Sequence, residues 1–170
     1  RGVNTYPFMV AAADVTGDNK LDLVAPCQNS TAVGSVVVLP GNGTVTPGTP
    51  TPYSVGMNAQ KPQWVQLVDL NGDAKVDLVA VGSDGRAHVL IGTGDGKTLP
   101  VVSYNVGGTP EFVLLGNFDA DSKPDVLTGG SSWGSSSTSL TLAIGNGDGT
   151  LGGLRGIPTG YSLDYATAAD

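Results

Sequence analysis

A nine-residue acidic pattern occurs repeatedly along this chain, and it restricts the possible fold more than any other feature. It reads DVTGDNKLD from Asp14 and DLNGDAKVD from Asp69, and a divergent version, NFDADSKPD, starts at Asn117. The first position recurs at Asp170, so the intervals between starts are 55, 48 and 53 residues. Such a period predicts an array of similar structural units.

The repeat register extends beyond the acidic runs and predicts four strands in each period. A proline stands seven positions before each run, at Pro7, Pro62 and Pro110, and opens a strand that leads into it. A second strand leaves the run, as in LDLVAPC or VDLVAVG, and a third, such as AHVLIG, ends in a Gly-rich turn. A weaker fourth strand completes the period. Four antiparallel strands in about fifty residues are typical of a propeller blade.

We therefore predict an all-β protein: a β-propeller fragment with about three four-stranded antiparallel blades plus the first strand of a fourth. One partial domain would span 1–170, with blades at about 5–56, 60–107 and 108–160 and a further blade starting at 161–170. The 26 Gly and 11 Pro residues fit many short elements joined by tight turns. Three blades cannot close a ring, so further sequence or other chains should cover the open edges.

The acidic loops at 14–22, 69–77 and 117–125 have the composition of calcium sites. Calcium takes about six to eight oxygen ligands, so a short loop must turn several oxygens toward one point. Positions one, three, five and nine can offer side-chain oxygens, and position seven its carbonyl, while the lysine ammonium there reaches into water. The predicted ligands are Asp14, Thr16, Asp18, Lys20 and Asp22; Asp69, Asn71, Asp73, Lys75 and Asp77; and Asn117, Asp119, Asp121, Lys123 and Asp125.

Charge supports the same interpretation. The formal net charge is -7, and Glu111 is the only glutamate among fifteen acids. Three calcium ions would add +6 and leave about -1, which would relieve repulsion within the loops. The negative charge argues against nucleic acid as a partner, and no apolar stretch is long enough to insert into a membrane.

The acidic loops have two other possible interpretations, a helix–loop–helix calcium site and a set of simple polar turns. A helix–loop–helix calcium site requires Gly at position six and Glu at position twelve, whereas Gly17 and Gly72 occupy position four and position twelve is Ala25, Ala80 or Thr128. A single turn that contains Asp and Gly is usually only a polar turn, but here three turns share the same spacing of acidic residues.

The third loop departs from the pattern with Asn117 at position one and Ala120 at position four. If position four requires a positive φ, alanine there costs about 1 kcal/mol, so we expect this loop to bind calcium most weakly or to shift its backbone.

The loops DVTGDNKLD and DLNGDAKVD and the turn IGNGDGTL resemble the FG-GAP and VCBS family of calcium-binding β-propellers, which includes the head of integrin α chains. The resemblance covers essentially the whole chain. About three calcium ions in these loops would be structural, since each loop joins two strands. Because calcium is plentiful outside cells and scarce within, such sites predict an extracellular setting, either secreted or at the cell surface.

The remaining chemical groups are assigned structural roles. Cys27 is expected to be a small buried hydrophobe at a strand end. His88 is expected to be a hydrogen-bonded strand residue, since no recognisable nucleophile arrangement surrounds it. Asp84, Asp95 and Asp148 fit hairpin turns.

Two further kinds of surface feature remain open. Trp64 belongs to the strand register, whereas Trp133 in a Gly and Ser loop could stack on a sugar or a protein surface or fold back on its own blade. Asn29 and Asn42 lie in acceptor sequences for N-glycosylation.

The sequence favours a noncatalytic function. We expect a calcium-stabilised propeller segment that recognises a protein or glycan through its blade loops, or that assembles with copies of itself in a filament or surface layer. The alternative is an accessory or scaffold propeller of a secreted carbohydrate-active enzyme. Fold does not decide between these functions.

Overall fold

The computed structural model describes residues 9–27, 33–44, 46–58, 62–130 and 139–159, and this part of the chain is all β. Twelve strands form three four-stranded sheets, each in simple sequential order. The first sheet contains β1 (Ala11–Ala13), β2 (Asp22–Cys27), β3 (Val33–Leu39) and β4 (Thr51–Asn58). The second contains β5 (Pro62–Val68), β6 (Asp77–Gly82), β7 (Arg86–Leu90) and β8 (Val102–Asn105). The third contains β9 (Phe112–Gly116), β10 (Asp125–Gly129), β11 (Ser139–Gly145) and β12 (Leu151–Pro158).

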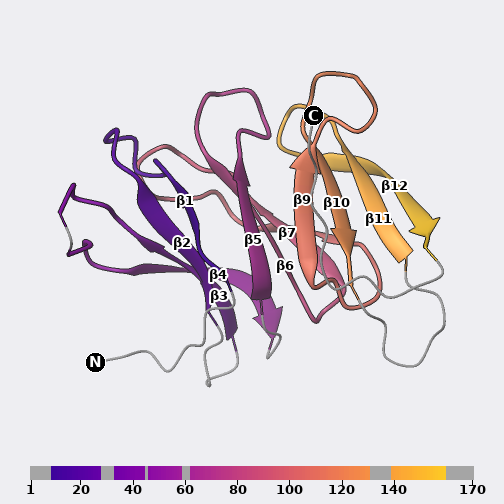
Figure 1. The fold of residues 1–170 in the computed structure, drawn as a ribbon, viewed down its shortest axis with the longest axis horizontal. Helices are drawn as coiled ribbons and strands as arrows, with labels where there is room; N and C mark the ends of the chain where they lie inside the picture. The colour runs from indigo at the N-terminus through magenta and orange to yellow at the C-terminus, as the bar shows by residue number, and fades with distance from the viewer. Residues whose placement is uncertain (1–8, 28–32, 45, 59–61, 131–138, 160–170) are drawn as a thin grey trace.

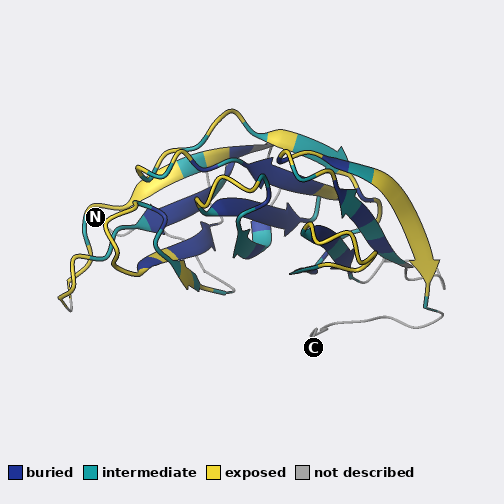
Figure 2. Ribbon diagram, turned by 90° about the horizontal axis from the view of Figure 1, so that it is seen from above, coloured by how far each residue is buried: buried dark blue, intermediate teal, exposed yellow. Residues whose placement is uncertain are grey.

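The three sheets are the propeller blades predicted from the repeat, and they lie side by side (Figure 1). All strand pairs are antiparallel, and each acidic loop joins the first two strands of its blade. The first strands of neighbouring blades touch, because β5 contacts both β1 and β9. Seen from above, the blades follow one another along an arc rather than a closed ring (Figure 2).

Apolar side chains are buried mainly between neighbouring blades. One core cluster joins the first and second blades through residues such as Val24, Val36 and Leu78, and a second joins the second and third blades through residues such as Val79 and Val126. The second blade is thus a two-faced sheet whose alternating side chains serve two interfaces. The dark, buried positions in Figure 2 follow these interfaces.

The outer faces of the two end blades have no neighbouring blade among the described residues. Val65 and Val113, at the same register position, are fully buried, whereas Val10 is 54% exposed. Likewise Val15 at position two of the first loop is 2% exposed, whereas Phe118 in the third loop is 40% exposed. Equivalent residues differ because the end blades lack a packing partner on one side.

The structure places some of the single residues and segments considered in the sequence, whereas others lie outside the described residues. Cys27 is buried at the end of β2, as predicted, and Trp64 is half-buried against the second core cluster. Asn42 is exposed. Asn29, Trp133 and the predicted start of a further blade at 161–170, Asp170 included, lie outside the described residues. None of the described segments forms a helix that could span a membrane.

Blade packing predicts unequal effects of one substitution at two equivalent positions. Val65→Ala should lower the free energy of unfolding by about 2 kcal/mol, because it removes two buried methyl groups and leaves a cavity. Val10→Ala should change it by less than about 0.5 kcal/mol. Chemical denaturation of both variants measures the difference, and equal losses would contradict an open face on the first blade.

Candidate metal centre

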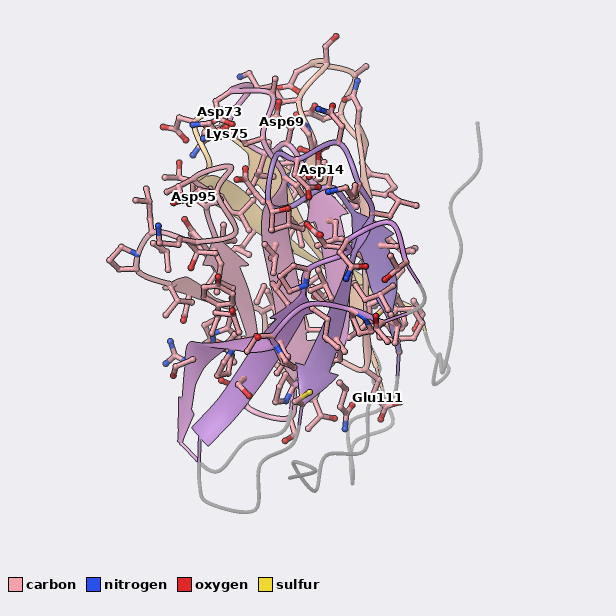
Figure 3. The ribbon with its side chains drawn as sticks, turned by 90° about the vertical axis from the view of Figure 1, so that its left-hand side faces the viewer. Asp14, Asp69, Asp73, Lys75, Asp95 and Glu111 are labelled. Carbon is pink, nitrogen blue, oxygen red and sulfur yellow. The ribbon has the colours of Figure 1, made fainter. Side chains whose placement is uncertain are left out.

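The three acidic loops lie at one end of the blades. Figure 3 places Asp14, Asp69, Asp73 and Lys75 at this end and Glu111 at the opposite end. The loops are called loop 1 (14–22), loop 2 (69–77) and loop 3 (117–125), and positions one to nine are counted within each. Positions five, seven and nine make corresponding contacts in all three, whereas position one differs in loop 3, so the loops are compared position by position.

The acid at position nine is fully buried in every loop and connects the loop to the third strand of its blade. In loop 2, Asp77 Oδ2 accepts the Leu70 N–H at 2.9 Å and Oδ1 accepts the Gly92 N–H at 2.8 Å. Asp22 and Asp125 make the corresponding bonds. Burial raises the pKa of the Asp77 carboxyl, although its two N–H bonds oppose the rise.

A glycine at the end of each third strand makes this bond possible. A Cβ on Gly92 would collide with the Val76 carbonyl, and the same collision would occur at Gly41 and Gly145 with the carbonyls of Leu21 and Pro124. The close approach of two backbones therefore requires glycine. Sequence reasoning treated position nine only as a ligand and missed this role, although a glycine after each third strand was the available signal.

The acid at position one organises the turn in loops 1 and 2. Asp14 accepts three backbone N–H bonds of 2.7–3.1 Å, from Gly17, Asp18 and Asn19. Asp69 accepts the equivalent three. Within the described residues, Asn117 of loop 3 accepts none of these bonds. An amide has only one acceptor oxygen, so asparagine cannot reproduce the two-oxygen pattern of a carboxylate.

Two positions in each loop have a positive φ. Position four is Gly17 (73°), Gly72 (77°) or Ala120 (65°), and position six is Asn19 (63°), Ala74 (63°) or Ser122 (68°). The positive φ suspected at position four is therefore confirmed, and Ala120 adopts it without a backbone shift. Position six was not anticipated. Loop 3 carries non-glycine residues at both positions and has the greatest backbone strain.

The lysine at position seven differs from its prediction. Its ammonium does not simply extend into water but folds back onto the position-five carboxylate, at 2.8 Å for Lys20 and Asp18. The Lys20 ammonium lowers the pKa of Asp18, and the backbone N–H of Lys75 is the main cause of the lowered pKa of Asp73. The ammonium thus makes a charge-assisted hydrogen bond within the loop, although a pair exposed to this extent stabilises the fold only slightly.

Several observations test whether the loops fit a metal ion. The carboxylate oxygens of Asp119, Asp121 and Asp125 lie within 4.8 Å of one another. In loop 1, the buried Oγ1 of Thr16 at position three has no hydrogen-bond partner among the described atoms. The donors at the side-chain positions are all oxygens, which is the set that calcium prefers. The oxygen donors are of the kind that calcium takes, but among the described residues only loop 3, despite its strained backbone, brings three carboxylates this close together.

Each described neighbouring blade covers the loop before it. The Gly-rich turn between β7 and β8 reaches loop 1, where the Gly96 N–H donates to the Val15 carbonyl at 3.1 Å. A Cβ on Gly17 would lie 2.5 Å from the Gly94 carbonyl oxygen, so position four of loop 1 needs glycine for space as well as for φ. The turn between β11 and β12 similarly approaches Asn71 of loop 2 through Gly149. Loop packing and blade packing are therefore linked.

The acids outside the loops make the turn contacts predicted for them. Asp95 accepts hydrogen bonds from the Thr93 hydroxyl and the Lys97 backbone, and Asp148 accepts two from Thr150. The Lys97 ammonium pairs with Asp95 and lowers the pKa of that carboxyl to about 2. These bonds account for both aspartates within hairpin turns.

His88 is a buried and fully hydrogen-bonded strand residue, as predicted, but the fold gives it unexpected neighbours. Its Nε2 lies 3.0 Å from Asp84 Oδ2, and its Nδ1 lies 2.8 Å from Ser103 Oγ on β8. With Asp84 ionised, Nε2–H donates to the carboxylate and Nδ1 accepts the serine hydroxyl. The sequence alone does not predict these neighbours, because the pairing of His88 with Ser103 depends on the register of β7 and β8. The ring is only 1% exposed and does not reach solvent.

Removing the strain in loop 3 should stabilise the protein. Ala120→Gly should raise the free energy of unfolding by about 1 kcal/mol, because glycine adopts a positive φ without a Cβ clash. Ala12 on β1 is exposed and has no positive φ, so Ala12→Gly should lower stability by about 0.5–1 kcal/mol. Denaturant titration in a chelator measures both, and two losses of equal size would contradict strain at Ala120.

The buried histidine should make stability depend on pH. Burial lowers the pKa of His88, while Asp84 opposes and Arg86 adds to the decrease. The unfolded chain therefore takes up a proton as pH falls through about 6.5 before the folded chain does, so stability is full above that pH and declines below it. His88→Gln should remove this part of the decline. Unfolding of both proteins in chelator at pH 7.5 and 5.5 measures it, and a difference that is independent of pH would contradict the prediction.

Comparison with known proteins identifies the repeat family of the chain. The FG-GAP-like repeat model matches residues 14–80 and, overlapping them, 69–128. No curated protein matches the chain. A crystal structure of BBS1N in complex with ARL6DN, soaked with lead, aligns with 92% of this chain at 16% identity and a TM-score of 0.44. The present chain spans 56% of that chain. The family model matches more than half of the residues of the present chain, and the chain therefore belongs to the FG-GAP-like repeat family.

Proposed function

We propose that this chain is a noncatalytic, calcium-stabilised propeller segment of an extracellular or cell-surface protein. It serves recognition of a protein or glycan through its blade loops, or assembly with other blade surfaces. The observation that carries the proposal is the repeated side-chain geometry of three acidic loops at one end of the blades. Repetition in three settings argues for a shared requirement rather than for three unrelated polar turns.

The residues that would hold calcium are those at positions one, three, five and nine, with the carbonyl at position seven. When bound, calcium would supply positive charge to a loop that carries three carboxylates. The chain's own residues already hold the loops in shape: position one gathers backbone N–H groups in loops 1 and 2, and position nine fixes every loop to its third strand. Since such sites of modest affinity fill where calcium is plentiful, we assign the protein to the extracellular side.

The open outer faces support an assembly or multiblade function. Val10 and Phe118 are exposed at positions whose counterparts pack between blades. A surface of the same kind, from further blades or from another copy, would bury them in the way that the described blades bury one another. The proposal of a noncatalytic role is supported by the burial of His88, the single histidine of the chain.

Calcium addition tests the proposal. A hundredfold excess of calcium over the dissociation constant should stabilise the folded chain by about 2.7 kcal/mol per site, which is an increase of roughly 5–10 °C in Tm. Thermal unfolding of the full chain in chelator and in calcium measures the shift. An unchanged Tm together with no calcium binding by calorimetry would overturn the calcium assignment.

A pair of variants locates the effect. Asp73→Asn removes a candidate ligand from loop 2 and should reduce the calcium-induced shift. Asp148→Asn removes the same charge from a hairpin turn and should leave the shift unchanged. Equal effects of the two variants would show that net charge, rather than the loop, determines the response.

A further inference from the structure

The same ion pair occurs in each of the three acidic loops. The ammonium of the position-seven lysine lies beside the outer oxygen of the position-five aspartate, and the lysine side chains are nearly half exposed. The pairs are Lys20 and Asp18 at 2.8 Å, Lys75 and Asp73 at 3.3 Å, and Lys123 and Asp121 at 3.3 Å. An aspartate and a lysine two residues apart also pair at Asp95 and Lys97 in a hairpin turn, but in the loops the aspartate is a predicted calcium ligand.

Packing fixes the direction of each lysine. Its methylene stem lies against a glycine of the turn between the third and fourth strands of the same blade. A Cβ on Gly94 would lie 2.9 Å from Lys75 Cδ, and one on Gly147 would lie 2.8 Å from Lys123 Cδ. These glycines also have a positive φ, of 77° and 78°. The turn thus leaves room for the stem and directs the ammonium toward the loop.

The other oxygens of the loop carboxylates already have donors from the backbone. In loop 2, Asp69 accepts three N–H bonds, Asp77 accepts two, and Asp73 Oδ1 accepts the Lys75 N–H at 2.9 Å. The second oxygen of Asp73 instead faces the lysine ammonium. A cation entering the loop would therefore compete with a positive charge that the chain itself supplies.

We propose that the position-seven lysine is an internal counter-ion, which partly neutralises each loop without metal and must leave the position-five carboxylate when calcium binds. This inference rests on the proposed calcium function and adds its regulation. With the lysine in place, three loop carboxylates and one ammonium leave a formal charge of -2 per loop. The loop stays formed when calcium is scarce, and the affinity for calcium is lower than the carboxylates alone would give.

The test compares Lys75→Met with the wild-type full chain. Methionine keeps an unbranched stem against Gly94 but removes the ammonium. In chelator the variant should have a lower Tm than wild type, whereas in saturating calcium this gap should close. Calorimetric titration should show calcium binding to the loop 2 site tighten by roughly two- to fivefold, which corresponds to the usual strength of an exposed ion pair.

Two matched variants separate displacement from general charge effects. Lys97→Met removes the same charge from the turn that covers loop 1, where Lys97 pairs with Asp95 rather than with a loop carboxylate. It should leave calcium affinity near the wild-type value. Lys75→Arg keeps a cation and should bind calcium like wild type.

The outcomes distinguish the two proposals. No calcium binding by the wild-type chain would overturn the proposed function, and displacement with it. Wild-type binding with the same affinity in Lys75→Met would overturn displacement alone. Equal tightening in Lys75→Met and Lys97→Met would also overturn it, because loss of net charge would then suffice. A selective gain in Lys75→Met, with its loss of stability in chelator, supports the internal counter-ion.

Discussion

The hydrogen bonds of the position-nine carboxylate are the constraint on which the rest of each blade depends. This buried acid accepts an N–H from position two of its own loop and another from the glycine that ends the third strand. An ionised group without partners would be costly there, so the loop, the second strand and the third strand must keep one relative position. The acid therefore has a structural role whether or not a metal is bound.

Contacts between blades extend this constraint along the arc. The Gly-rich turn of the second blade bonds to loop 1, and the turn of the third blade approaches loop 2. Within a blade, the lysine stem rests on a glycine of the same turn. Each turn thus contacts its own loop on one side and the preceding loop on the other. The Gly-rich turn that packs against the lysine of one loop therefore also packs against the loop of the preceding blade. A movement of the lysine in one loop could thus be felt in the contact between two blades.

The open ends of the arc follow from the same repetition. Residues in equivalent positions are buried or exposed according to whether another blade stands beside them, as Val65 and Val10 show. A repeat unit cannot bury both of its faces alone, so a partial array keeps an apolar surface at each end. This property connects the fold to the proposed assembly function.

The sequence by itself determined the number of strands per repeat, the blade architecture and the position of the acidic loops. These features are local: strand alternation, prolines before strands and the spacing of aspartates each act over a few residues. The glycines at position four of two loops also raised the question of a positive φ there, which the backbone then answered. The spacing of the aspartates did not predict which residues distant in the sequence form hydrogen bonds or pack together.

Only the tertiary structure decided which side-chain oxygens of the loops already accept hydrogen bonds from the protein. It showed that position nine binds the third strand, that the lysine ammonium returns to position five, and that Ser103 and Asp84 flank His88. In each of these contacts, the distance between the two side chains depends on the strand register or on the side-chain rotamer. One sequence pattern is compatible with several registers and rotamers. The physical reason is that a repeat specifies the geometry of its backbone locally, whereas the partners of a side chain depend on which strand or turn lies opposite.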